Sequence, residues 1–156
     1  MRCVARERER ACSGKIAGMS LYEDAGGFDR ILALCKAWHA RLQQDPLAWH
    51  PFERGTHPRH DERLAAYLAE AFGGPPLYTA GFGDESSMTR IHAGHGEHVD
   101  LDEACLNAFD LAVADAGFTG DVAQRISAYF RRATEAQREW GDPKRRVPDG
   151  LPFNRA

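Results

Sequence analysis

The chain has 156 residues, a length typical of one domain. Its composition, with 43% hydrophobic and 28% charged residues, is typical of a globular protein. No apolar run approaches the ~20 residues that a membrane-spanning helix requires, so we expect no membrane partner. The first residues also lack the apolar stretch of a secretory signal. The net charge of −3 excludes the strongly basic balance typical of nucleic-acid-binding proteins, so we expect no nucleic-acid partner.

The charge divides the chain into three parts. Residues 1–18 carry +3 and residues 141–156 carry +2, so residues 19–140 carry −8. Residues 1–18 have no apolar periodicity, so we expect a disordered basic extension, and Met19 is a candidate for the natural start. Residues 19–140 are predicted to form the single domain. Residues 141–156 are rich in Pro and Gly and are predicted to be a flexible tail.

Four cysteines are spread along the chain, and no two of them form a CxxC pair. They are Cys3, Cys12, Cys35 and Cys105. This spacing does not suggest a disulfide framework, and it favours a reducing, cytoplasmic location.

The first half of the domain shows two helical patterns. Apolar residues recur at helical spacing from Phe28 to Leu42, between a double glycine and Asp45-Pro46. Thr56 is a candidate N-cap for a second helix, whose apolar stripe runs from His60 to Phe72. The run Gly73-Gly74-Pro75-Pro76 should end that helix.

The second half continues the helical pattern. Ser86 or Ser87 can cap a short helix that carries Met88, Ile91 and His92. Asp100, followed by Glu103, is similar to a capping box and predicts a helix that ends at Gly117. Thr119 can cap the last helix. Alternating patterns typical of strands are missing from the sequence, so the fold class is predicted to be all-α.

Histidine is the unusual residue of this composition, because all seven histidines fall within sixty positions. They are His39, His50, His57, His60, His92, His95 and His98. His39 and His60 each lie on an apolar helical face, where a hydrogen-bonded core histidine is more common than a ligand.

The series His92, His95, His98 offers a different hypothesis. On one helix face, this HxxHxxH spacing could bind zinc or iron in a non-haem metal-binding protein or hydrolase. Gly94 and Gly96 disfavour one helix through all three residues, and no HExxH motif stands near them. The alternative is a single special histidine at the end of a short helix.

Taken together, five segments resemble truncated haemoglobins of the group II type. The resemblance is collinear over about residues 20–136. The matching segments are the double-glycine opening Tyr22–Phe28, the turn from Asp45 to Phe52, the helix from Asp61 to the Gly-Gly-Pro at Pro75, the Met88–Ala93 segment with its His-Ala pair, and residues 104–114.

The resemblance implies a two-over-two helical sandwich around one haem b. It implies that His92 is the axial iron ligand and that the protein binds a diatomic gas, O₂ or NO. Arg63 is expected to face a haem propionate. The other implied cofactor-binding residues are Leu64, Phe52, Tyr67 and Ile91. An NO dioxygenase or peroxidase-like activity would require an external reductase, because the chain has no GxGxxG fingerprint.

The side of the haem opposite His92 departs from the family pattern. His39 stands where group II members usually carry Tyr, and Cys105 stands where they usually carry Trp. His60 occupies a position where many globins carry a distal histidine. The distal ligand-binding residues are therefore expected to be His39, His60 and Cys105, and the sequence leaves open which histidine contacts the gas.

Overall fold

The computed structural model describes residues 19–156, and the predictions made for residues 1–18, with Cys3 and Cys12, lie outside the described residues. The described part is all-helical and contains no strand, which confirms the predicted fold class. Within this part, no helix is both long and apolar enough to cross a membrane. The elements are α1 (Leu21–Asp24), α2 (Phe28–Leu42), α3 (Pro46–Trp49), η1 (His50–Phe52), α4 (His60–Ala71), α5 (Leu77–Gly81), α6 (Glu85–His92), α7 (Val99–Asp115), α8 (Gly120–Gln137) and η2 (Arg138–Trp140).

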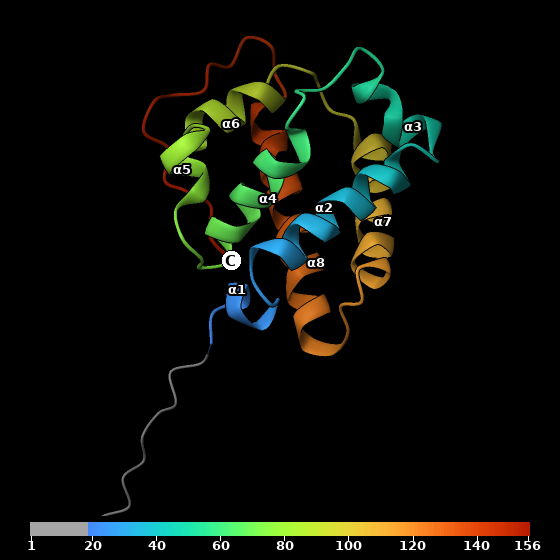
Figure 1. Ribbon diagram of the computed structural model, residues 1–156. Coiled ribbons are helices and arrows are strands. Elements are labelled where there is room, and N and C mark those ends of the chain that lie inside the picture. The colour runs from blue at the N-terminus through green and yellow to red at the C-terminus, as the bar shows by residue number, and fades with distance from the viewer. Residues whose placement is uncertain (1–18) are drawn as a thin grey trace, which may run out of the picture.

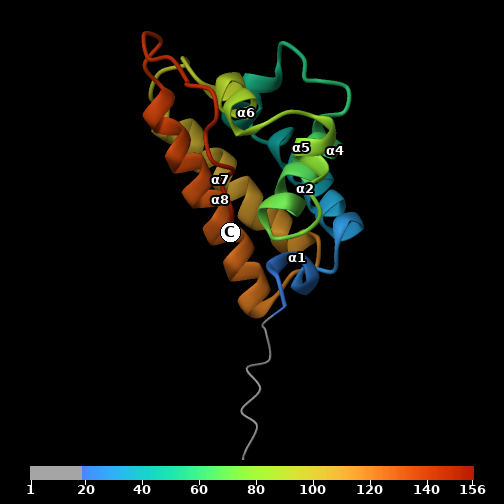
Figure 2. The same ribbon diagram turned by 90° about the vertical axis from the view of Figure 1, so that its left-hand side faces the viewer.

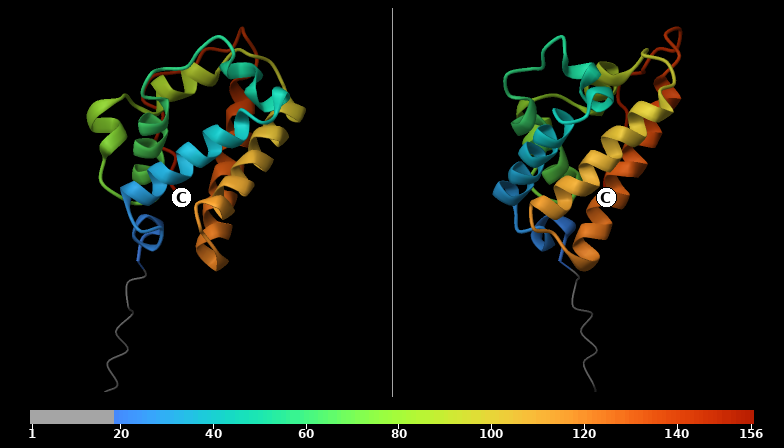
Figure 3. Two further views of the ribbon diagram at one scale, coloured as in Figure 1. Left: turned by 45° about the vertical axis from the view of Figure 1, so that its right-hand side comes forward. Right: turned by 90° about the vertical axis from the view of Figure 1, so that its right-hand side faces the viewer.

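Four helices form two layers. Helix α2 packs against both α4 and α7, while α7 and α8 lie side by side as an antiparallel pair (Figures 2 and 3). The short helices α3, α5 and α6 lie around this frame (Figure 1). The α2–α4 pair therefore covers the α7–α8 pair, as the predicted two-over-two sandwich requires.

Aromatic side chains from three of these helices meet in the core. Phe109 of α7 and Phe130 of α8 stack with ring centroids 3.7 Å apart. Trp38 of α2 lies edge-on to both rings, at 6.1 Å from Phe109 and 5.3 Å from Phe130. Edge-on contacts between aromatic rings are favourable because the positive ring edge faces the negative ring face. This cluster fixes α2 on the α7–α8 pair.

The Gly-Gly-Pro-Pro run ends α4 for two separate reasons. Gly73 adopts a φ of +90°, which side chains other than that of glycine rarely adopt. A Cβ at Gly74 would lie 2.6 Å from ring atoms of Tyr22, so only glycine lets this segment pass so close to the ring. The backbone N–H of Tyr22 also donates to the carbonyl of Phe72 at 2.9 Å. The end of α4 is thereby joined to the start of the domain.

Three predicted helix starts are wrong by a few residues. Helix α4 starts at His60, not after Thr56, because the Arg59 N–H is taken by the His57 side chain at 3.0 Å. Helix α6 is capped by Asp84, whose carboxylate accepts from the Ser87 N–H, and not by Ser86 or Ser87. Helix α7 begins at Val99, which places Asp100 inside its first turn rather than at its cap.

The short helix α5 was not predicted, and a buried carboxylate from α4 supports it. Glu70 is only 2% exposed. Its Oε2 accepts from the backbone N–H groups of Tyr78 and Thr79 at 3.1 and 3.0 Å, and its Oε1 accepts from the Thr79 hydroxyl at 2.8 Å. These N–H groups belong to the first turn of α5 and have no partner within the helix, so Glu70 acts as its distant cap.

The structure differs from the flexible tail expected for residues 141–156. This segment follows η2 and has no regular secondary structure, but it runs past α6 and ends against α4 (Figure 1). The backbone N–H groups of Leu151 and Asn154 donate to Ser86 and to Glu85, and the N–H of Ala156 donates to the Ala71 carbonyl at 2.8 Å. Most of these hydrogen bonds use backbone groups of the segment, which leave no periodic pattern in the sequence, so the sequence did not reveal this packing.

Phe153 is the apolar anchor of this segment, because its ring lies 4.8 Å from the ring of Tyr67 and 6.4 Å from that of Tyr78. We expect Phe153→Ala to lower the free energy of unfolding by about 2 kcal/mol, less than the roughly 3–5 kcal/mol of a fully buried phenylalanine. Urea unfolding followed by circular dichroism measures this change.

Leu111→Ala is the matched control, because it truncates an apolar side chain that is 52% exposed on α7. It should change the free energy of unfolding by less than about 0.5 kcal/mol. Equal effects of the two substitutions would show that the tail does not pack against the core in solution.

Candidate functional site

His92 is the last residue of α6, and the local sequence determines this position. The Asp84–Ser87 capping box fixes the start of the helix. Ala93 then turns to an extended conformation, and Gly94 adopts a φ of +78°, so the helix cannot continue. The imidazole is thereby held at the C-terminal end of a rigid two-turn helix, next to the exposed side chain of Ile91.

The hydrogen bond of the His92 ring defines its protonation. Nδ1 lies 3.0 Å from the backbone carbonyl oxygen of Met88, one turn earlier on α6. A carbonyl oxygen can only accept, so Nδ1 carries the proton and Nε2 keeps its lone pair. The surrounding protein lowers the pKa of His92 by desolvation, and the nearby His60 and His95 lower it further. The lowered pKa favours the neutral imidazole, and in the Nδ1–H tautomer its Nε2 is free.

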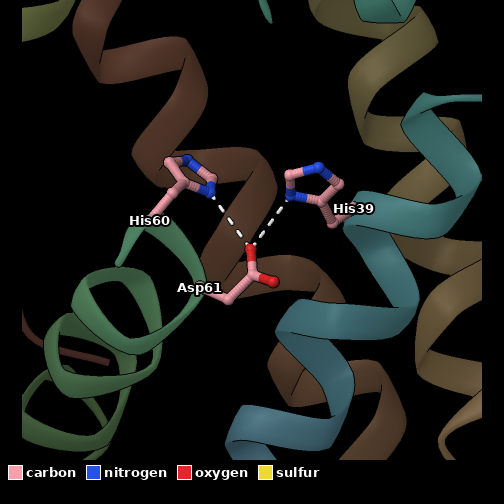
Figure 4. A group of neighbouring side chains, drawn as sticks. All are labelled: His39, His60 and Asp61. Atoms are coloured by element: carbon pink, nitrogen blue, oxygen red, sulfur yellow. Dashed lines mark hydrogen bonds and ion pairs between the residues drawn. The ribbon is translucent and has the colours of Figure 1, made fainter. Parts of the chain in front are cut away.

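The other notable cluster joins α2 and α4. The carboxylate of Asp61 lies between two imidazoles, with Oδ1 3.0 Å from Nδ1 of His39 and 3.2 Å from Nδ1 of His60 (Figure 4). His39 comes from the last turn of α2, whereas His60 and Asp61 open α4. A carboxylate in the first turn of a helix and an imidazole in the last turn are both favourable placements relative to the helix dipole.

Aromatic side chains surround the two imidazoles. The His60 ring stacks on Trp38 at 6.4 Å and meets Phe52 edge-on at 5.5 Å. The His39 ring lies 5.4 Å from the ring of Trp49 and 6.2 Å from that of Phe52. These contacts restrict both rings, so the geometry around Asp61 is set by the packing as well as by the two hydrogen bonds.

Cys105 lies next to this cluster but is not part of it. Its carbonyl oxygen accepts from Nε1 of Trp38 at 3.0 Å, and its thiol approaches the carbonyl oxygen of Ala48 at 3.9 Å. Burial raises the pKa of the Cys105 thiol to about 11, so it stays protonated at neutral pH. Cys105 is therefore connected to His60 through Trp38, and its sulfur is directed toward α3.

Arg63 belongs to a pair of cations at the start of α4. The guanidinium of Arg63 lies 5.7 Å from the centre of the Phe82 ring, and that of Arg59 lies 5.1 Å from the same ring. Neither arginine forms an ion pair with a carboxylate within residues 19–156. Both guanidinium groups are therefore available to an anionic group of a ligand.

Leu64 and Tyr67, two further predicted contacts on α4, have different surroundings. Leu64 is half-buried at the edge of the core. Tyr67 is 6% exposed, and its hydroxyl donates to the carboxylate of Glu85 at 2.9 Å. Burial raises the pKa of the Tyr67 phenol, with the Glu85 charge adding to this effect. The Tyr67 hydroxyl is therefore already hydrogen-bonded inside the protein, to the carboxylate that also accepts from the backbone N–H of Asn154.

The series His92, His95, His98 does not form one group. Gly94 and Gly96 both adopt positive φ values, and the His98 ring instead contacts the backbone carbonyl of His95. Among residues 19–156, the only three His, Cys, Asp or Glu side chains whose ligand atoms converge within 4.8 Å are His39, His60 and Asp61. This arrangement does not support the non-haem metal site expected as an alternative.

Sequence reasoning missed Asp61 and Trp38 as members of the site. Asp61 follows His60 directly, but only the crossing of α2 over α4 brings it to His39. Trp38 precedes His39 in the chain and belongs to the apolar stripe of α2, so its pattern indicated a core residue. No local sequence signal distinguishes a residue of the core or of a helix start from a residue of this site.

The comparisons with known proteins agree with this architecture. The model of the bacterial-like globin family matches residues 20–138. Among curated proteins, no relative matches the chain. A haemoglobin from the thermophilic phototrophic bacterium Chloroflexus aurantiacus is 26% identical, with a TM-score of 0.67 over 77% of this chain and 98% of that one.

Two further solved structures share the fold. The group II truncated haemoglobin from Bacillus anthracis is 20% identical, with a TM-score of 0.69 over 77% of this chain and 91% of its own. A thermostable haemoglobin from the actinobacterium Thermobifida fusca is 24% identical, with a TM-score of 0.63 over 76% and 96% of the two chains. These matches confirm the resemblance to truncated haemoglobins. The family model covers most of the chain, and the chain therefore belongs to the bacterial-like globin family.

Proposed function

We propose that this globin binds haem b through His92 and uses it to bind a diatomic gas, O₂ or NO, reversibly. The observation that carries this proposal is the His92 ring itself. Its Nδ1–H donates to the Met88 carbonyl, its pKa is lowered, and its Nε2 is left as a free donor atom for a metal. A neutral imidazole oriented in this way is suited to be a single axial ligand.

Haem supplies an iron with one further coordination position for a small gas. The propionates and the apolar ring of haem require a cation and apolar side chains, and the chain offers both. Arg63 provides a cation for a propionate, while Phe52, Leu64 and the 57% exposed Ile91 provide apolar surface. The ring of Tyr67 is proposed as a supporting wall, because its hydroxyl is held by Glu85. Free thiols at Cys35 and Cys105 are consistent with the proposed cytoplasmic location.

The distal histidines are proposed to act as proton acceptors at Nε2. Asp61 is positioned to accept an Nδ1–H from each ring, and in that tautomer Nε2 of His39 and His60 keeps its lone pair. In this tautomer each ring accepts at Nε2, and it donates from that atom only when Nε2 carries a proton. This behaviour differs from that of the Tyr and Trp donors expected in group II relatives. Either histidine can fill this role.

The test of haem binding is His92→Ala. We expect this variant to retain less than about a tenth of the haem of the wild type, because the one proposed iron ligand is gone. The haem-to-protein ratio of the purified proteins, measured after extraction of the haem, gives the result.

His95→Ala is the control for this test, because it removes an exposed imidazole three residues further along. It should bind haem as the wild type does. Full haem content in His92→Ala, or a wild type purified with zinc and without haem, would refute the proposal.

A second prediction concerns Arg63. We expect Arg63→Ala to release haem several times faster than the wild type, because a propionate loses its charged partner, whereas Arg63→Lys should restore most of the retention. The rate of haem transfer to an excess of a haem-free acceptor protein measures this. Arg125→Ala is the control, because Arg125 of α8 pairs with Asp24 of α1 and is not one of the proposed haem contacts. It should leave the rate of haem transfer unchanged.

A peroxidase-like activity with an external reductase or other electron donor is the second candidate function. The observation that favours it is the Asp61-held pair of imidazoles, because an acceptor Nε2 can take a proton from hydrogen peroxide. We expect Asp61→Ala to slow peroxide-dependent oxidation of a dye by about tenfold or more, while the haem content stays at the wild-type value. An unchanged rate would remove the support for this activity.

A further inference from the structure

We propose that His39, His60 and Asp61 form a binding site for a divalent transition-metal ion such as Zn²⁺, separate from the metal ligand His92. The three side chains come from the ends of two crossing helices, and one ligand atom from each lies within 4.8 Å of the other two. Figure 4 shows the carboxylate placed between the two rings, with both Nδ1 atoms directed toward it.

The distances are close to those of a bound ion. Zn²⁺ holds nitrogen and oxygen ligands at about 2.0–2.2 Å, so two ligands of a tetrahedral ion lie about 3.3–3.5 Å apart. The two Nδ1 atoms lie 3.0 and 3.2 Å from Asp61 Oδ1. Both distances are slightly shorter than this spacing, and the three ligand atoms lie within 4.8 Å of one another, so the carboxylate has to move outward for an ion to enter between the three groups.

The donor set selects the class of ion. Two imidazole nitrogens and one carboxylate oxygen suit Zn²⁺ and its transition-metal neighbours, whereas Mg²⁺ and Ca²⁺ prefer oxygen ligands alone. Three protein ligands leave a fourth position for water. The side chains of His39, His60 and Asp61 are 22%, 28% and 25% exposed, so none of the three is sealed within the core.

Metal binding would change the proton on each ring without releasing one. A neutral imidazole that binds the ion at Nδ1 must carry its proton at Nε2, so the proton moves from one nitrogen to the other and the Asp61 oxygen exchanges two hydrogen bonds for one metal bond. The outer nitrogen of each ring changes from acceptor to donor. The ion would thereby reverse the distal hydrogen-bonding character described above.

The experiment titrates the purified protein with Zn²⁺ and counts bound ions by native mass spectrometry, with calorimetry for the affinity. We expect one tightly bound Zn²⁺ per chain. His39→Gln, His60→Gln and Asp61→Asn should each weaken binding by more than about tenfold, since even outer-shell partners of a metal contribute 10- to 100-fold. The double variant His95→Gln/His98→Gln, which removes two exposed imidazoles, should bind as the wild type does.

A second measurement uses the wild type alone and does not depend on how the variants fold. X-ray absorption at the zinc edge should show two imidazole ligands and only nitrogen or oxygen neighbours. Absence of tight zinc, a ligand set with other than two imidazoles, or loss of binding in the His95/His98 variant alone would overturn the proposal. Zinc binding is read independently of haem content, so a failure of the haem proposal is distinguishable from a failure of this one.

Discussion

Trp38 connects the hydrophobic core of this globin to its histidine cluster. One side of the indole meets Phe109 and Phe130, the stacked pair that joins α7 to α8. The same ring stacks on His60, and its N–H donates to the Cys105 carbonyl on α7. The position of α2 in the core therefore sets where His60 can lie. A change in the core packing would be transmitted to the site through one side chain.

A second region of the molecule combines buried carboxylates with the aromatic contacts of Phe153. Glu85, in the first turn of α6, accepts from the Tyr67 hydroxyl and from the backbone of Asn154. Ser86, the next residue, accepts from the backbone of Leu151. Helix α6 is thus joined to α4 and to the C-terminal segment at its start, while His92 stands at its end. Because α6 is only two turns long, what holds its start also orients His92.

The sequence predicted those features that local pattern determines. The apolar periodicity of α2 gave both of its ends, and the Gly-Gly-Pro-Pro run gave the end of α4. Gly94 and Gly96 predicted correctly that α6 would not continue through His95. Helix starts were less predictable, because Asp84 caps α6 ahead of the expected serines and the His57 side chain binds the Arg59 N–H before α4 begins.

Features that depend on contacts between residues far apart in the chain could not be predicted from local sequence patterns. Glu70 supports α5 from another helix, and the C-terminal segment is held by hydrogen bonds of its backbone N–H groups and by the Phe153 ring, both against residues far away in the chain. The same holds for the candidate site, where His39 and His60 were singled out one by one. The carboxylate between them was not, since residues 22 positions apart in the chain meet only when α2 crosses α4.

The imidazoles of His92, His39 and His60 differ in their hydrogen-bond acceptors, and this difference determines how freely each ring can be rearranged. His92 donates to a backbone carbonyl within its own helix, an acceptor that cannot move unless α6 unwinds. Its orientation is therefore as rigid as the helix, which suits a ring that must hold one bond in one direction. His39 and His60 share a carboxylate on a side chain with rotatable bonds. That acceptor can turn away from either ring, and the proposed ion would bind between them, so the hydrogen bonds of His39 and His60 are easier to rearrange than that of His92.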